Sequence, residues 1–126
     1  MYNYNATCVR VVDGDTIDAM IDLGFGVHVK KRIRLAGINA PESRTRNKVE
    51  KKLGLAAKER LIEIMDGAAN CFELESQELG KYGRVLGKLQ IDRIAGKDLI
   101  TKVCVNDCLV KEGHAVEYDG GKRKTF

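Results

Sequence analysis

The sequence has no tryptophan, a single proline and no long hydrophobic run. Aromatic residues make up 6% of the chain, which disfavours a surface that binds nucleic acid mainly by stacking bases on aromatic side chains. No run is long and apolar enough to span a membrane as a helix, and the first residues lack the basic and apolar segments of a signal peptide. We therefore expect a cytoplasmic protein that does not associate with membranes.

Cysteine motifs that bind metals are also lacking. The four cysteines, Cys8, Cys71, Cys104 and Cys108, form no Cys-x-x-Cys pair, and there are only two histidines. This spacing does not suit a zinc site. We interpret the cysteines as buried thiols that act as small hydrophobic residues, and a disulfide is the less favoured alternative.

The composition that is present fits one folded domain. The 126 residues match the common size of a domain, and a hydrophobic fraction of 44% is enough for a core. Charged residues make up 32% of the chain and the net charge is +4, which weakly favours a polyanionic partner. We expect a monomer with one domain over residues 1–126 and a flexible tail from about residue 119.

Hydrophobic periodicity predicts the order of the secondary structure elements. The predicted strands are Thr7–Val12, Thr16–Leu23, Val27–Ala36, Asn70–Ser76 and Val85–Asp92, and the predicted helices are Lys48–Met65 and Lys102–Glu112. Five short strands with a helix between the third and the fourth have the element order of an OB-fold barrel. The sequence therefore predicts an α+β fold built on a five-stranded OB-fold β-barrel with two helices.

The same periodicity assigns the residues that face the core. In the second and third strands they are Ile17, Ala19, Ile21, Leu23, Val27, Val29, Ile33 and Leu35. In the first helix they are Val49, Leu53, Ala57, Leu61 and Ile64. Arg34 falls on the opposite face of its strand, and we expect Ser43–Lys48 to form a mobile basic loop.

Two carboxylates lie in the turn between the first two strands. Asp13 and Asp15 flank Gly14, and aspartates in such turns often bond only their own backbone. Asp15, however, lies at the exit of the turn, where the following strand would fix its direction. A hard divalent cation favours oxygen ligands held in such rigid positions.

Further polar groups follow the third strand. The single proline, Pro41, fixes the path of an almost uncharged segment that ends at Glu42. Ala40 precedes the proline and is therefore held extended, so that its carbonyl could point at a cation. Arg34, and Arg84 in the Lys-Tyr-Gly-Arg segment, could donate planar bidentate hydrogen bonds to a phosphate.

These segments together resemble the staphylococcal nuclease (thermonuclease) family. The matching motifs are Val-Asp-Gly-Asp-Thr at 12–16, Arg-Leu-Ala-Gly-Ile-Asn-Ala-Pro-Glu at 34–42, Lys-Tyr-Gly-Arg at 81–84 and Leu-Val-Lys-Glu-Gly at 109–113. The resemblance extends from about Thr7 to Tyr118. It implies an OB-fold barrel with helices and a calcium-dependent enzyme that cleaves DNA and RNA and leaves 3′-phosphate ends.

The resemblance also implies a role for each matching residue. The positions are Asp15, Asn39 and the Ala40 carbonyl for calcium, Arg34, Arg84 and Glu42 for catalysis, and Tyr82 and Tyr118 for the nucleotide pocket. Glu42 would be the general base. Further phosphate contacts could come from Lys81, Arg44, Arg46, Lys48 and Lys122–Lys124, although each of these could equally be a solubilising charge.

One position departs from the family pattern. Asn39 stands where the family has a second aspartate that binds the metal. An amide oxygen can still bind calcium, but the site loses a negative charge, so we expect weaker calcium binding. Asn39 also favours the alternative function, a non-catalytic OB-fold module that binds nucleic acid, whereas Asp15, Arg34, Glu42 and Arg84 favour an enzyme. The sequence leaves the choice between DNA and RNA open.

Overall fold

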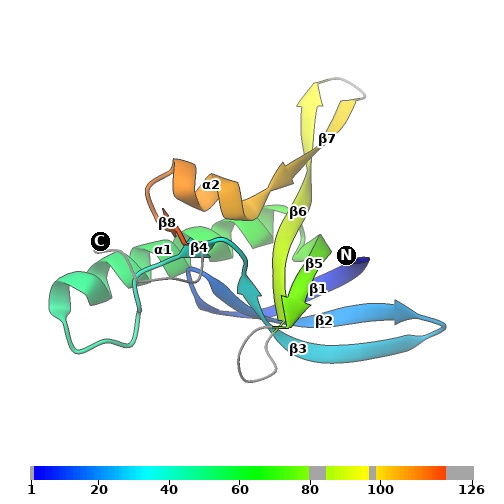
Figure 1. Ribbon diagram of the computed structural model, residues 1–126. Coiled ribbons are helices and arrows are strands. Elements are labelled where there is room, and N and C mark those ends of the chain that lie inside the picture. Colours follow the sequence, from blue (N-terminus) through cyan, green and yellow to red (C-terminus); the bar gives the residue numbers. More distant parts are fainter. Residues whose placement is uncertain (1, 80–84, 97–98, 119–126) are drawn as a thin grey trace.

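The computed structural model describes residues 2–79, 85–96 and 99–118 (Figure 1). In chain order the elements are β1 (Tyr2–Asp13), β2 (Thr16–Gly24), β3 (Val27–Leu35), β4 (Ile38–Asn39), α1 (Lys48–Gly67), β5 (Cys71–Leu79), β6 (Val85–Gly96), β7 (Leu99–Cys104), α2 (Val105–Lys111) and β8 (Val116–Glu117). The predicted flexible tail, with Lys122–Lys124, lies outside the described residues. So do Lys81, Tyr82 and Arg84.

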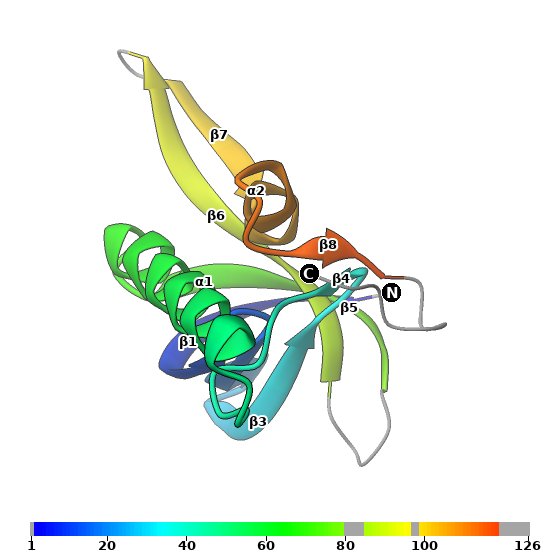
Figure 2. The same ribbon diagram turned by 90° about the vertical axis from the view of Figure 1, so that its left-hand side faces the viewer.

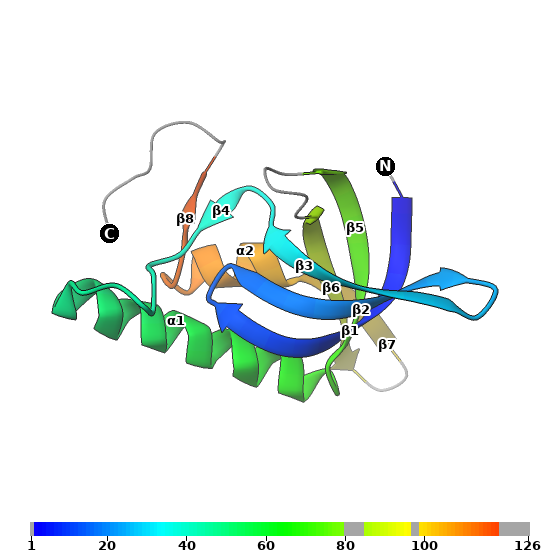
Figure 3. The same ribbon diagram turned by 90° about the horizontal axis from the view of Figure 1, so that it is seen from below.

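Five strands close into a barrel, which confirms the predicted OB-fold. The sheet order is β3-β2-β1-β5-β6-β7, and a further pairing between β3 and β6 closes the ring. That closing pair is parallel, from Ile33 opposite Val85 to Leu35 opposite Gly87, whereas the other barrel pairs are antiparallel. Helix α1 packs along the barrel beside β1 and β2 (Figure 3).

The segment before the second helix differs from the prediction. The predicted helix begins at Lys102, but residues 99–104 form the strand β7, which pairs with the extended end of β6. Helix α2 accordingly begins at Val105 instead of Lys102. The β6–β7 hairpin projects beyond the barrel (Figure 2), and Ile100, Thr101 and Lys102 of β7 are exposed, so the alternation that marks a strand in sequence is weak there.

The buried residues of the barrel follow the predicted alternation, but the core includes fewer residues than predicted. Ile17, Ile33 and Leu35 are fully buried. Leu23 and Val27, which were predicted to face the core, are 46% and 52% exposed. They lie where the β2–β3 hairpin extends past the barrel (Figure 1), so no second layer covers them.

Helix α1 buries the second half of the predicted stripe but not its start, since Ala57 and Leu61 are fully buried as predicted. Its start is capped by the side chain of Asn47, which accepts hydrogen bonds from the amides at 49 and 50. Val49 and Leu53 were predicted to face the core but are 71% and 43% exposed. The fully buried positions are Gly54, Ala57, Leu61 and Met65. Gly54 and Ala57 are small because the helix lies close to the chain at Glu42 and Gly14 there, whereas Leu61 and Met65 fill the core further along the helix.

All four cysteines are free, so the disulfide alternative is wrong. Cys8 is buried as expected, whereas Cys71 is exposed, which contradicts the prediction for that thiol. Burial raises the pKa of the Cys8 and Cys104 thiols. Within the described parts of the chain, neither helix is long and apolar enough to cross a membrane.

A charged pair on the outer face of β2 and β3 makes the stability of the hairpin depend on pH. Asp18 lies directly opposite Arg32, and the Arg32 Nε donates to Asp18 Oδ1 over 2.9 Å. This hydrogen bond, together with the charges of Arg32 and Arg10, lowers the pKa of Asp18 below its ordinary value of 3.8. The stabilisation is therefore present above that pH and is lost as the pH falls through the lowered pKa.

We expect Asp18→Asn to be less stable than the wild type at neutral pH, because the amide keeps an acceptor but loses the charge that attracts Arg32. Thermal unfolding of the two proteins should differ at pH 7 and converge as the pH falls through the lowered pKa of Asp18. Glu59→Gln, an exposed carboxylate on α1, provides the control. A deficit of the same size at both pH values would show that Asp18 acts through packing instead of charge.

Candidate active site

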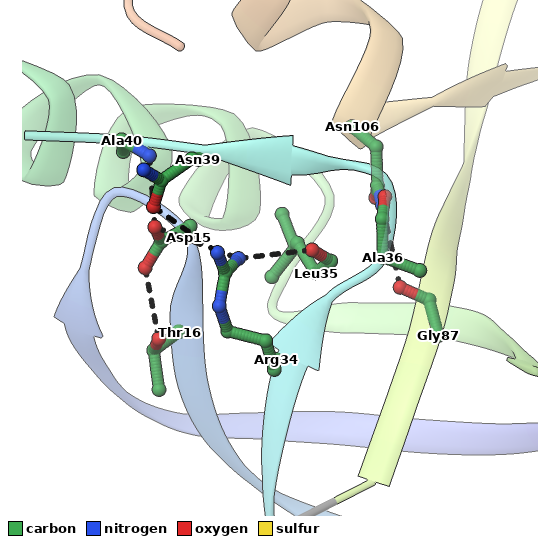
Figure 4. A network of polar contacts seen from close by, with 9 residues as sticks. All are labelled: Asp15, Thr16, Arg34, Leu35, Ala36, Asn39, Ala40, Gly87 and Asn106. Atoms are coloured by element: carbon green, nitrogen blue, oxygen red, sulfur yellow. Dashed lines mark hydrogen bonds and ion pairs between the residues drawn. The ribbon is translucent and has the colours of Figure 1, made fainter. Parts of the chain in front are cut away.

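The candidate site lies where the β1–β2 turn meets the chain that follows β3. Figure 4 shows this region, in which Asp15 comes from the turn between β1 and β2, Arg34 from β3 and Asn39 from β4. The backbone amide of Leu35 donates to the carbonyl of Asp15 over 2.8 Å, which fixes the turn against the end of β3. The structure therefore brings together two segments that the sequence predicts to meet.

Asp15 connects these segments through its side chain. It is 7% exposed, and its Oδ1 accepts a hydrogen bond from the hydroxyl of Thr16 at 2.9 Å. Its Oδ2 accepts a hydrogen bond from the backbone amide of Ala40 at 2.8 Å. The same oxygen lies 3.5 Å from Nη1 of Arg34. Asp15 thus bonds across the site as well as to its neighbour Thr16.

Arg34 is turned into the site instead of out into solvent. Its side chain is only 15% exposed. Nη1 donates to the carbonyl of Leu35 over 3.1 Å, and Nη2 donates to Oδ1 of Asn39 over 3.2 Å (Figure 4). A guanidinium has five N–H donors in a plane, so these bonds hold the group in place and leave donor capacity for an anion.

A second hydrogen-bonded contact joins the same two segments on the other side of Glu42. Oδ1 of Asp13 accepts hydrogen bonds from the hydroxyl of Ser43 and from its backbone amide, the latter at 3.2 Å. Ser43 is 5% exposed, so it is a fixed residue and not the start of a mobile loop as predicted. The carboxylates on either side of Gly14 therefore hold the amides on either side of Pro41 and Glu42.

Helix α1 packs closely against both segments, at Gly54 and at Ala57. A Cβ at Gly54 would lie 2.3 Å from the carbonyl oxygen of Glu42. A Cβ at Gly14 would lie 2.7 Å from the Cβ of Ala57 and 3.1 Å from that of Ala40. Only a hydrogen atom fits at either glycine, so the helix backbone sets the position of Glu42. The sequence signal was a glycine within a helical pattern, which is unfavourable unless packing requires it.

Asn106 fixes the corner that follows β3, and sequence reasoning missed it. Its side chain is 1% exposed, and Nδ2 donates to the carbonyls of Ala36 at 2.8 Å and Gly87 at 3.3 Å (Figure 4). Its Oδ1 accepts from the amide of Leu89 at 3.2 Å. One buried amide therefore joins α2, β6 and the segment that carries Arg34. An asparagine in an amphipathic helix gives no sequence signal for this role.

The remaining site candidates within the described residues lie around the same region, and most of them are exposed. Glu42 is exposed, so its carboxylate is accessible to solvent. The backbone amide of Tyr118 donates to the carbonyl of Gly37 over 2.8 Å, just after β8 pairs with β4. This places Tyr118 beside the same corner. Arg44, Arg46 and Lys48 are exposed and follow Glu42.

The oxygen atoms at the site fit a hard cation in type. Asp15 and Asn39 both contact Arg34, so a carboxylate and an amide oxygen lie on the same side of the site. Among the described residues, no three Asp, Glu, His or Cys side chains gather closely enough to hold a metal. A cation here would therefore need amide or backbone carbonyl oxygens beside Asp15, and calcium accepts both.

Comparisons with known proteins identify similar sequences. A family model described as "Staphylococcal nuclease homologue" matches residues 32–125. A curated relative, a micrococcal nuclease of Shigella flexneri, is 30% identical over 118 residues. That match covers 92% of this chain but 59% of the relative, so the chain spans less than two thirds of the relative's length.

We expect Gly54→Ala to destabilise the protein by about 1–3 kcal/mol, because the added methyl group must displace the Glu42 backbone or the helix. Gly67→Ala is the matched control, because a Cβ at that end of the same helix meets nothing within 4 Å. The control should be neutral or stabilising by up to about 1 kcal/mol. Equal denaturant midpoints for the two variants would contradict the close contact at Gly54.

Proposed function

This chain belongs to the staphylococcal nuclease family, and from that premise we propose that it is a calcium-dependent nuclease. It would hydrolyse phosphodiester bonds of DNA or RNA and leave 3′-phosphate ends. The observation that carries the proposal is the pair of carboxylates around Gly14. They anchor the backbone on either side of Glu42, and one of them, Asp15, also contacts the inward-turned Arg34. The name of the curated relative, a nuclease, supports the same reaction class.

Calcium would be held by Asp15, Asn39 and the carbonyl of Ala40, whose oxygens suit a hard cation. When bound, it would supply a Lewis acid that polarises a phosphate oxygen and lowers the pKa of a water molecule. Arg34 lies beside both side-chain ligands, so a phosphate at this position would contact the guanidinium at the same time.

Proton transfer is assigned to Glu42. Its carboxylate is exposed at a position where the backbone on both sides is anchored, so it can reach a water molecule without losing its orientation. Taking a proton from that water generates the nucleophile. Arg34 would stabilise the negative charge that develops on the phosphoryl oxygens, because its N–H groups are already aligned by Leu35 and Asn39.

Other residues complete the proposal by family resemblance. Arg84 would stabilise the leaving group, and Lys81 and Tyr82 would contact the substrate; all three lie outside the described residues. Tyr118, whose backbone is held at Gly37, would line the nucleotide pocket. A non-catalytic module that binds nucleic acid remains the second candidate, because Asn39 supplies an uncharged ligand and already bonds Arg34.

We expect calcium-dependent cleavage of single-stranded DNA by the wild type, and loss of about 10²- to 10³-fold in kcat for Arg34→Ala, the range measured when one electrostatic donor is removed. Glu42→Gln should lose activity while still binding DNA. Glu59→Gln, an exposed glutamate on α1, is the control and should keep full activity. Binding without cleavage in the wild type, with or without a chelator, would favour the non-catalytic module.

We expect Asn39→Asp to bind calcium several-fold more tightly than the wild type in a calorimetric titration, because the substitution adds a charged oxygen ligand at nearly the same shape. Asn3→Asp adds the same charge at an exposed position on β1 and should leave calcium affinity unchanged. Unchanged affinity in Asn39→Asp would remove residue 39 from the metal site.

A further inference from the structure

The tip of the β2–β3 hairpin carries an unusual aromatic residue. Phe25 has a φ of 57°, between Gly24 at 86° and Gly26 at 75°. Glycine or asparagine is the ordinary choice for such left-handed turn positions, and a bulky side chain there is unfavourable. The Phe25 side chain is also fully exposed, at 106% of its reference area. Neither its backbone conformation nor its exposure stabilises the fold.

The surroundings of Phe25 combine apolar surface with positive charge. Leu23 and Val27 flank the turn and are 46% and 52% exposed. Lys30 and Lys31 follow on β3 and are exposed, with side chains on opposite faces of the strand. Neither forms an ion pair within the described parts of the chain, although the charge of Lys30 acts on Asp18. An exposed aromatic ring and exposed ammonium groups on one hairpin are the combination that binds single-stranded nucleic acid, through base stacking and phosphate contacts.

The hairpin is continuous with the candidate active site. Thr16 follows Asp15 at one end of β2, and Gly24 lies at the other end (Figure 3). The eight residue steps between them correspond to about 26 Å of extended strand, at about 3.3 Å per residue. A nucleic acid strand at about 3.4 Å per nucleotide would cover this distance with about eight nucleotides. A substrate bound at the site could therefore reach the tip.

We propose that the β2–β3 hairpin is a second contact for the nucleic acid substrate, in which the Phe25 ring stacks on an unpaired base and Lys30 and Lys31 contact phosphates. The proposal rests on the proposed nuclease function for its substrate. In this proposal the tip of the hairpin binds single-stranded nucleic acid about eight nucleotides from the scissile bond. That number follows from the length of β2.

Phe25→Asn tests the stacking contact, and its stability readout excludes unfolding as the cause. Asparagine tolerates the left-handed turn, so the thermal midpoint should stay the same or rise. Affinity for a fluorescent 20-nucleotide single-stranded DNA, measured by anisotropy in chelator, should fall about tenfold. Phe25→Trp should keep the affinity. Tyr2→Ser removes an exposed aromatic residue on β1 and serves as the control with unchanged affinity.

Phe25→Leu separates base stacking from a general apolar contact with protein or lipid. Leucine keeps the hydrophobic surface but has no ring, so affinity should fall as it does in Phe25→Asn. Wild-type affinity in either Phe25→Leu or Phe25→Asn would overturn the stacking proposal.

The lysines are tested by the salt dependence of the same binding. Replacing Lys30 and Lys31 together by glutamine should reduce the slope of log affinity against log salt by about 1.4, for two phosphate contacts on a single strand. Lys51 and Lys52, an exposed adjacent pair on α1, provide the matched control. An unchanged slope in the Lys30 and Lys31 variant would overturn their role.

These outcomes are separate from those of the proposed nuclease function, because binding is measured without calcium. If the wild type fails to cleave but Phe25→Asn still weakens binding, the nuclease proposal fails and the hairpin contact stands. If the wild type cleaves and Phe25→Asn binds the 20-nucleotide strand as tightly as the wild type, the hairpin contact fails alone.

Discussion

The candidate site depends on two backbone amides that donate to carboxylates on either side of Gly14. Ala40 donates to Asp15 and Ser43 donates to Asp13, so a turn and a proline-fixed segment that are far apart in sequence are held as one unit. Glu42 lies between the two anchored residues. The aspartates therefore act first as structural acceptors, and any role in binding a cation is added to that function.

Packing behind the site limits how this unit can move. Gly54 allows the backbone of α1 to contact the carbonyl of Glu42, and Gly14 rests on Ala57. Asn106 holds the corner after β3 to β6 from the opposite side. The site is thus fixed by a close helix contact and a buried amide, both of which lie outside the segments that would bind a substrate. Such support is what precise positioning of catalytic groups requires.

The sequence predicted the barrel well because its strands alternate strictly where they are buried. Sequence-based prediction failed at positions whose burial or contacts are set neither by hydrophobic periodicity nor by residue propensity. Leu23 and Val27 continue the alternation but extend past the core, and residues 100–102 of β7 are exposed, so burial does not mark that part of the strand. Close backbone contacts at Gly54 and the buried amide of Asn106 depend on the tertiary arrangement. The catalytic and metal-binding roles of the site residues stay predictions.

The most direct test of a shared cation site is a calcium titration followed by NMR of backbone amides. The amide of Ala40 bonds the carboxylate that would bind calcium, so its resonance reports on that oxygen. Saturable shifts at Asp15, Asn39 and Ala40, absent in Asp15→Asn, are the predicted result. Calcium shifts confined to other parts of the protein, or no saturable shift at these three residues, would contradict the account.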